Sequence, residues 1–189
     1  MNHISAPARV PANATAEGDG IVVGDGAVRV DAYVDFQCPF CRQFELSSGP
    51  ALASMVADGR INLVYHPMSF LDQVSTTRYS SRAAASSGCA SDGGKFREYA
   101  GALFVNQPPE GGAGLSDEEL VSMGVSVGLP ESAFGSCVLG GKYLDWPPYV
   151  TATATRRGVN ATPSVFVEGA PVPANARTIT AAVAAAAVR

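Results

Sequence analysis

The segment Cys38-Pro39-Phe40-Cys41 constrains the fold of this chain most strongly, because it separates an alternating apolar stretch from a helical one. Residues 27–36 place Val, Ala or Phe at every second position, which is the pattern of a β-strand. Pro39 suits the first turn of a helix, because its ring presets φ and its missing N–H would have no helical partner there. The sequence therefore predicts a strand, a short link and a helix that begins at Cys38.

The position of Cys38 at the start of this helix favours its thiolate form. Unpaired main-chain N–H groups and the positive end of the helix dipole stabilise a negative charge there, and the thiolate is the form that attacks disulfides. Cys41 lies one turn further on the same face, about 5–6 Å away, a spacing that a disulfide can bridge. We therefore expect a redox pair in which Cys38 attacks and Cys41 resolves.

A Cys-x-x-Cys pair can also be half of a zinc site, which needs two more cysteine or histidine ligands at short spacing. The remaining candidates are His3, His66, Cys89 and Cys137, and none of them forms a second pair. We therefore expect no metal. An inert structural disulfide is disfavoured as well, because so small a loop removes little entropy from the unfolded chain.

A second pattern lies near the end of the chain, where Thr162-Pro163 precedes the apolar run 164–167. This run predicts a strand, Glu168-Gly169 a turn and Pro171-Val172 a short edge strand. A proline that enters a strand is a boundary residue by default, so this step alone carries little functional information.

Together the two patterns resemble the thioredoxin superfamily, and within it the DsbA-like thiol-disulfide oxidoreductases of the bacterial cell envelope. The resemblance is carried by residues 35–45, Asp-Phe-Gln-Cys-Pro-Phe-Cys-Arg-Gln-Phe-Glu, and by Thr162-Pro163 with its following strand. It covers nearly the whole chain from about Gly20 and is strongest toward the actinobacterial, mycobacterial members. It implies an α/β thioredoxin fold, a central mixed β-sheet flanked by helices, with an inserted all-helical domain.

The resemblance also implies roles for individual residues. Pro163 is expected in the cis form, facing the cysteine pair, where Thr162 and Pro163 expose main-chain groups to an extended substrate segment. Glu45 matches an acid that helps to move the proton of the resolving cysteine; the alternative is an ordinary glutamate on the helix surface. Asp35 could serve similarly or simply end the strand.

Phe40 departs from the best-known oxidant of the family, which has histidine at this position. The thiolate therefore loses a positively charged neighbour, and we expect a weaker oxidant. The pKa of Cys38 is expected between the values of DsbA and thioredoxin, about 3.5 and about 7. The reduction potential is expected between about −120 and about −270 mV.

The pattern along the chain divides it into three parts. We assign residues 20–74 and 158–189 to the thioredoxin-like domain and residues 75–157, whose periodicity is helical, to the inserted helical domain. Residues 1–19, rich in Ala, Pro, Asn and Thr, are expected to be a flexible N-terminal linker. The expected helices after the first are 79–90, 95–105, 116–127, 131–139, 149–157 and 176–188, and residues 60–67 form a further strand.

Cys89 and Cys137 fall on different predicted helices of the insert. The family members that the chain resembles carry an extra cysteine pair in this segment, and a Cys89–Cys137 disulfide is the simplest connectivity once Cys38 and Cys41 form the redox couple. We expect a structural disulfide. The alternatives are a second shuttle pair and two free buried thiols, which a cytosolic location would favour.

Charge and hydropathy limit the possible partners. A formal net charge of −4 offers no basic footprint for nucleic acid, and no apolar run is long enough to span a bilayer. The expected location is extracytoplasmic, with the protein secreted or tethered by an N-terminal anchor that precedes this sequence.

The expected function is the introduction of disulfide bonds into exported proteins. The alternatives are a disulfide isomerase or reductase and, from another class, a redox-silent peptide-binding chaperone. We expect a monomer without a cofactor, with unfolded or reduced exported proteins as substrates. A membrane quinone-linked reoxidase of the DsbB or vitamin K epoxide reductase type is the partner that the resemblance implies.

Overall fold

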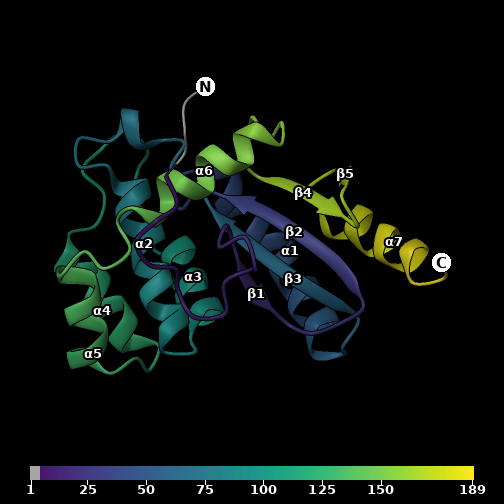
Figure 1. Cartoon of the computed structure of the whole chain (residues 1–189), viewed down its shortest axis with the longest axis horizontal. Helices are drawn as coiled ribbons and strands as arrows, with labels where there is room; N and C mark the ends of the chain where they lie inside the picture. Colours follow the sequence, from purple (N-terminus) through teal and green to yellow (C-terminus); the bar gives the residue numbers. More distant parts are fainter. Residues whose placement is uncertain (1–4) are drawn as a thin grey trace.

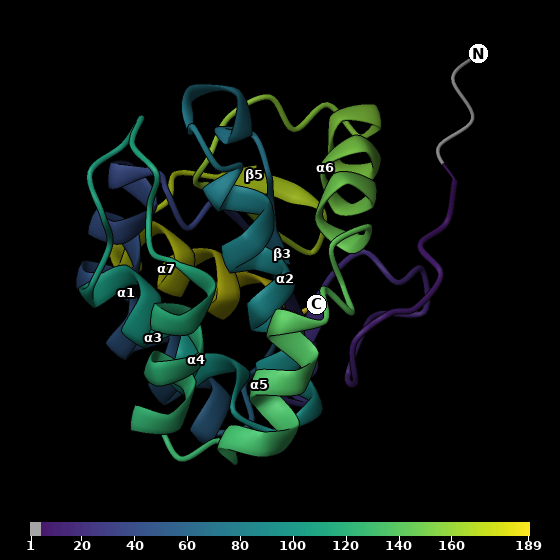
Figure 2. The same cartoon turned by 90° about the vertical axis from the view of Figure 1, so that its left-hand side faces the viewer.

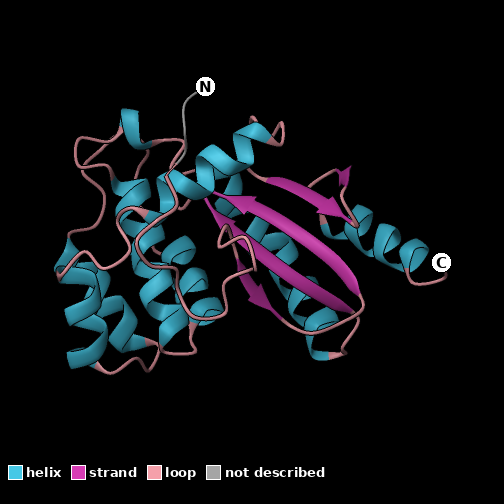
Figure 3. Cartoon of the chain, in the orientation of Figure 1, coloured by secondary structure: helices cyan, strands magenta, loops and turns pink. Residues whose placement is uncertain are grey.

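A single mixed sheet forms the centre of the computed structural model, which describes residues 5–189 (Figures 1 and 3). Its strands are β1 (Ile21–Val23), β2 (Val28–Val34), β3 (Ile61–Pro67), β4 (Ser164–Val167) and β5 (Ala170–Val172). Their order across the sheet is β1-β3-β2-β4-β5. The β2–β3 pair is parallel and every other neighbouring pair is antiparallel.

Helices cover both faces of this sheet and extend beyond one end of it. In chain order they are α1 (Pro39–Ala57), the 3₁₀ turn η1 (Asp72–Val74), α2 (Tyr79–Asp92), α3 (Phe96–Val105), α4 (Asp117–Ser126), α5 (Glu131–Leu139), α6 (Trp146–Arg156) and α7 (Ala176–Ala186). In Figure 1, α1 lies behind the sheet and α6 in front of it. A mixed sheet flanked by helices is the fold that the sequence predicts.

The central strand β2 is buried on both faces, because it lies between β3 and β4 and is covered by helices on each side. Val30 and Val34 are fully buried on one face, and Asp31 and Tyr33 are nearly so on the other. Helix α1 connects β2 to the parallel strand β3, as a parallel pair requires. The turn between β2 and α1 therefore lies where the central strands of the sheet end, and not at an edge strand.

Helices α2 to α5 form a helical block beside the sheet (Figure 2). The middle of α2 consists of small buried residues, 83–91, which let the neighbouring helices approach closely. The disulfide Cys89–Cys137 joins α2 to α5, with a Cα–Cα distance of 5.9 Å, and the predicted pairing is confirmed. The Ser116 side chain and Glu119 form the capping box at the start of α4.

The N-terminal segment packs against the folded chain, which corrects the flexible linker predicted over residues 1–19. The main-chain N–H of Ala12 donates to Asp92 at 2.9 Å, and the indole N–H of Trp146 donates to the carbonyl of Gly18 at 2.8 Å. A composition rich in Ala, Pro, Asn and Thr indicated a linker, but residues of α2 and α6 form hydrogen bonds with the backbone of this segment. Residues 1–4 of the predicted linker lie outside the described residues.

Across the described part of the chain, residues 5–189, no helix has both the length and the apolar character that crossing a bilayer requires.

Candidate active site

Cys38 is the N-cap residue of α1, with extended backbone angles of φ −77° and ψ 119°, and Pro39 takes the first helical position. Both placements agree with the sequence prediction. The main-chain N–H of Cys38 donates to the carbonyl of Asp35 at 3.0 Å, which fixes the turn between β2 and α1. Cys41 lies one turn into the helix, and both cysteines are free thiols in this structure.

The two sulfurs have opposite environments. Cys38 retains a small exposed surface, 5%, whereas Cys41 has none. A hydrogen bond with Cys41 and the main-chain N–H groups at the helix start lower the pKa of Cys38 to about 6, against the effect of burial. Burial, followed by the hydrogen bond with Cys38 and the charge of Cys38, raises the pKa of Cys41. The pair therefore combines one readily ionised sulfur with one that stays protonated, and the pKa of Cys38 lies within the expected range.

The loop before β4 approaches the attacking cysteine. The Thr162–Pro163 peptide bond is cis, and the carbonyl oxygen of Thr162 lies 3.6 Å from Cys38 Sγ. A groove of about 410 Å³ begins here and runs between α1 and the start of α7. Phe40, Phe44, Thr162 and Pro163 line it, and the Phe40 side chain is 69% exposed. Residues that are far apart in sequence thus form one surface beside Cys38.

Glu45 is buried, so its interpretation as an ordinary surface glutamate is wrong. Its carboxylate accepts a hydrogen bond of 3.1 Å from the Tyr65 hydroxyl and lies 3.7 Å from the Arg97 guanidinium. Burial raises its pKa, while Arg97 and Tyr65 oppose the rise. Its role in moving the proton of Cys41 stays a prediction.

Asp35 directly follows the last residue of β2 and contacts the redox pair through its main chain, while a role in moving the proton of Cys41 stays a prediction. Its main-chain N–H donates to Cys41 Sγ at 3.4 Å. Its carboxylate is fully buried and accepts hydrogen bonds from the N–H groups of Gln37 and Leu71 and from the Ser80 hydroxyl. Ser80 belongs to α2, so the helical block reaches the active site here.

Two glutamines near the cysteines were missed by sequence reasoning. The Gln107 side chain donates to the carbonyls of Phe36 and Cys38, each at 2.9 Å. Gln37 is buried, and its side chain contacts Leu71 and Gly111. No signal in the sequence marks either residue, because each acts through segments that only the tertiary fold brings to the CPFC turn.

His66 lies apart from this surface. Its Nε2 atom is 2.7 Å from Asp31, its Nδ1 atom is 2.6 Å from the carbonyl of Asp19, and its ring stacks on Tyr33. The ring is fully buried within this polar cluster. These contacts are those of a structural residue.

Comparisons with known proteins agree with this geometry. Residues 16–185 match a family model described as Thioredoxin. The serine/threonine-protein kinase PknE of Mycobacterium tuberculosis is 32% identical over 160 residues, which cover 79% of this chain. The chain spans only 28% of the length of this curated relative.

Solved structures extend the comparison. DsbA of Mycobacterium tuberculosis in its reduced form is 30% identical, with a TM-score of 0.72 over 81% of this chain and 84% of that one. DsbG of the same organism is 31% identical, with a TM-score of 0.72 over 82% and 80%. MdbA of Actinomyces oris, 22% identical, shares the fold with a TM-score of 0.77 over 93% and 89%.

Proposed function

Because the chain belongs to the thioredoxin family, and within it to the DsbA-like thiol-disulfide oxidoreductases, we propose that it is a dithiol oxidase that introduces disulfide bonds into exported proteins. The observation that carries this proposal is the asymmetry of the pair, in which the pKa of Cys38 is about 6 and that of Cys41 is raised. A thiol of low pKa is a good leaving group, and a stabilised thiolate favours the reduced enzyme. Both properties drive oxidation of the client.

The reaction begins with the Cys38–Cys41 disulfide. A client thiolate attacks Cys38 Sγ, the disulfide breaks, and Cys41 leaves and takes up a proton. A second client thiol, after losing its proton, attacks the client sulfur of the mixed disulfide, and Cys38 leaves as a thiolate. In going from dithiol to disulfide the client loses two electrons and two protons; the enzyme pair gains the two electrons and one proton, on Cys41, and the other proton goes to solvent.

The groove beside Cys38 supports peptide binding during this exchange. The carbonyl of Thr162 lies against Cys38, and the exposed ring of Phe40 offers an apolar contact for an unfolded client. An extended segment that pairs with the Thr162-Pro163 main chain would bring its cysteine to Cys38.

The proposal includes a location and a second partner. Net oxidation of clients requires an extracytoplasmic compartment and an acceptor for the two electrons, for which we propose a membrane quinone-linked reoxidase of the DsbB or vitamin K epoxide reductase type. The Cys89–Cys137 disulfide supports residence in an oxidising compartment.

Two refolding assays test the oxidase proposal. The oxidised protein is expected to speed formation of disulfides in reduced ribonuclease and to have little effect on scrambled ribonuclease. Rapid repair of the scrambled substrate would instead identify an isomerase. Unchanged activity of Cys38→Ser would point to a redox-silent chaperone. Equilibration with glutathione buffers gives the reduction potential, and a value as negative as that of thioredoxin, about −270 mV, would indicate a reductase.

A further inference from the structure

Asp35 is bound through its main chain to both redox cysteines. Its carbonyl accepts the N–H of Cys38 at 3.0 Å, and its own N–H donates to Cys41 Sγ at 3.4 Å. These contacts hold Asp35 next to the pair, three residues before Cys38 in the chain. Its carboxylate also interacts electrostatically with Cys38, so a change in the charge of Asp35 alters the stability of the Cys38 thiolate.

The Asp35 carboxylate is buried without a cationic partner among residues 5–189. Its three hydrogen-bond donors are neutral: the N–H of Gln37 at 2.9 Å, the N–H of Leu71 at 3.0 Å and the Ser80 hydroxyl at 2.7 Å. A buried carboxylate in this setting resists ionisation. Burial, together with a smaller contribution from the negative charge of Cys38, raises the pKa of Asp35 to about 6 against these hydrogen bonds.

The ionisable groups that face Asp35 carry no positive charge. At the start of α1 they are Cys38 and Cys41, and on α2 it is the Tyr79 hydroxyl, whose pKa is raised mainly by burial. The negative charge of Asp35 is therefore not neutralised within the site, and in a poorly solvated interior it opposes a second negative charge nearby.

We propose that Asp35 is a positioning residue that destabilises the Cys38 thiolate through its buried charge and thereby limits how strongly the protein oxidises its clients. Its three donors keep the carboxylate in place and partly ionised near neutral pH. The inference deepens the proposed function, because it concerns the same cysteine pair. Its test measures the thiol itself and so does not depend on oxidase activity.

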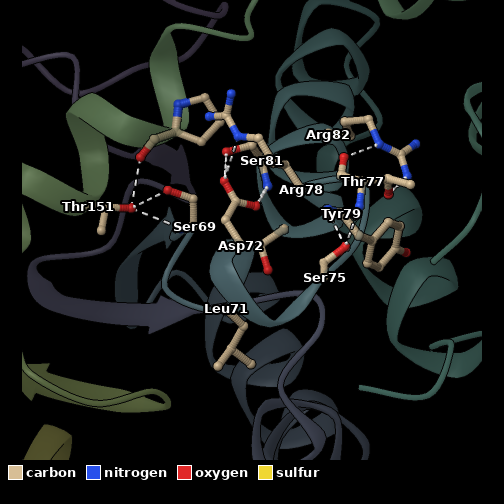
Figure 4. Close-up of polar contacts among 12 residues, drawn as sticks. Ser69, Leu71, Asp72, Ser75, Thr77, Arg78, Tyr79, Ser81, Arg82 and Thr151 are labelled. Atoms are coloured by element: carbon tan, nitrogen blue, oxygen red, sulfur yellow. Dashed lines mark hydrogen bonds and ion pairs between the residues drawn. The ribbon is translucent and has the colours of Figure 1, made fainter. Parts of the chain in front are cut away.

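Asp72, whose polar contacts are drawn in Figure 4, provides a matched control. Like Asp35, it fastens the segment after β3 to the first turn of α2, since its carboxylate accepts hydrogen bonds from the N–H and hydroxyl of Ser81. It also forms an ion pair of 3.5 Å with Arg78, and within residues 5–189 none of the hydrogen bonds or ion pairs of its carboxylate involves a cysteine. Asp72→Asn therefore changes a similar connection between the segment after β3 and α2, but it removes no carboxylate that contacts the cysteine pair.

The experiment is a titration of the ultraviolet thiolate absorbance in the reduced full chain. In the parent protein the curve is expected to be broader than that of a single site, because Asp35 and Cys38 titrate over the same range. In Asp35→Asn the curve is expected to narrow and its midpoint to fall below about 6. Each unit of that fall corresponds to about a tenfold gain in thiolate stability. In Asp35→Asn the glutathione equilibrium is expected to shift toward the reduced enzyme. In Asp72→Asn the midpoint of the thiolate titration and the glutathione equilibrium are both expected to match those of the parent.

A second variant covers the case in which Asp35→Asn does not fold, since its amide nitrogen would face the N–H of Leu71. Ser80→Ala removes one donor, which makes Asp35 harder to ionise, so the Cys38 midpoint is expected to move in the same direction by a smaller amount. An unchanged or raised midpoint in Asp35→Asn, or in Ser80→Ala when that variant alone folds, would overturn the proposal. An equal shift in Asp72→Asn would overturn it as well.

Discussion

The side-chain amide of Gln107 donates to the carbonyl oxygen of Cys38 at 2.9 Å and to that of Phe36 at the same distance. Gln107 follows α3, so it connects the helical block to the turn that holds the attacking sulfur. The Ser80–Asp35 hydrogen bond makes a second connection between the block and this turn. The helical block thus contributes directly to the geometry of the redox pair.

Gln107→Ala is expected to lower the free energy of unfolding by about 1 to 3 kcal/mol, because it leaves the carbonyl of Phe36 without its side-chain donor. The oxidation rate of a model client should fall as well, since the Cys38 carbonyl loses the hydrogen bond from Gln107 that holds the turn. Urea denaturation measures the first effect. Asn106→Ala is the matched control, because that exposed amide bonds only within its own helix. An equal loss in both variants would contradict the expectation.

Alkylation of the reduced protein is expected to follow the ionisation of Cys38. The rate with iodoacetamide should rise with pH around pH 6 and level off above about pH 7, since the thiolate is the reactive form. Mass spectrometry should find one adduct, on Cys38, because burial raises the pKa of Cys41. A rate that still rises between pH 7 and 9 would show that Cys38 has an ordinary thiol pKa.

Removal of the second disulfide is expected to reduce stability without altering the redox pair. Cys89 and Cys137 are 48 residues apart, and in the chain-entropy model a loop of this length contributes about 4 kcal/mol. The double variant Cys89→Ala, Cys137→Ala should therefore lose about 2 to 4 kcal/mol in non-reducing denaturation. Its glutathione equilibrium at Cys38 and Cys41 should match that of the parent. A shifted equilibrium would contradict a purely structural role.

Asp31→Asn is expected to lower the free energy of unfolding by about 3 kcal/mol, because it breaks a buried pair with His66 whose atoms lie 2.7 Å apart. Burial would raise the pKa of Asp31, but hydrogen bonds from His66 and Arg29 hold it at about 2. The ionised carboxylate therefore contributes stability above its ordinary pKa of about 4, and this contribution is lost as the pH falls toward 2.

Acid denaturation followed by circular dichroism measures the contribution of Asp31. The variant should lose the part of the parent's pH dependence that lies between about pH 4 and 2. Asp25→Asn, a change at an exposed aspartate, is the control and should behave like the parent. Identical curves for Asp31→Asn and the parent would rule out the expected contribution.

Sequence alone determined the elements whose cause is local. Alternation in residues 27–36 indicated β2, and Pro39 placed Cys38 at the start of α1, because a proline can occupy the first helical turn. The helices 79–90 and 131–139 also appear within a few residues of their predicted bounds. These patterns depend on neighbours in the chain, which the sequence contains.

Tertiary structure decided everything that depends on distant partners. Composition suggested a flexible segment before residue 20, yet Trp146 and Asp92 satisfy its backbone. The sequence left two alternatives for Glu45, an acid near the cysteine pair and a surface glutamate, and the contacts with Tyr65 and Arg97 exclude the second. Burial, hydrogen bonding and the resulting pKa depend on which segments meet in space, and no local pattern in the sequence encodes that.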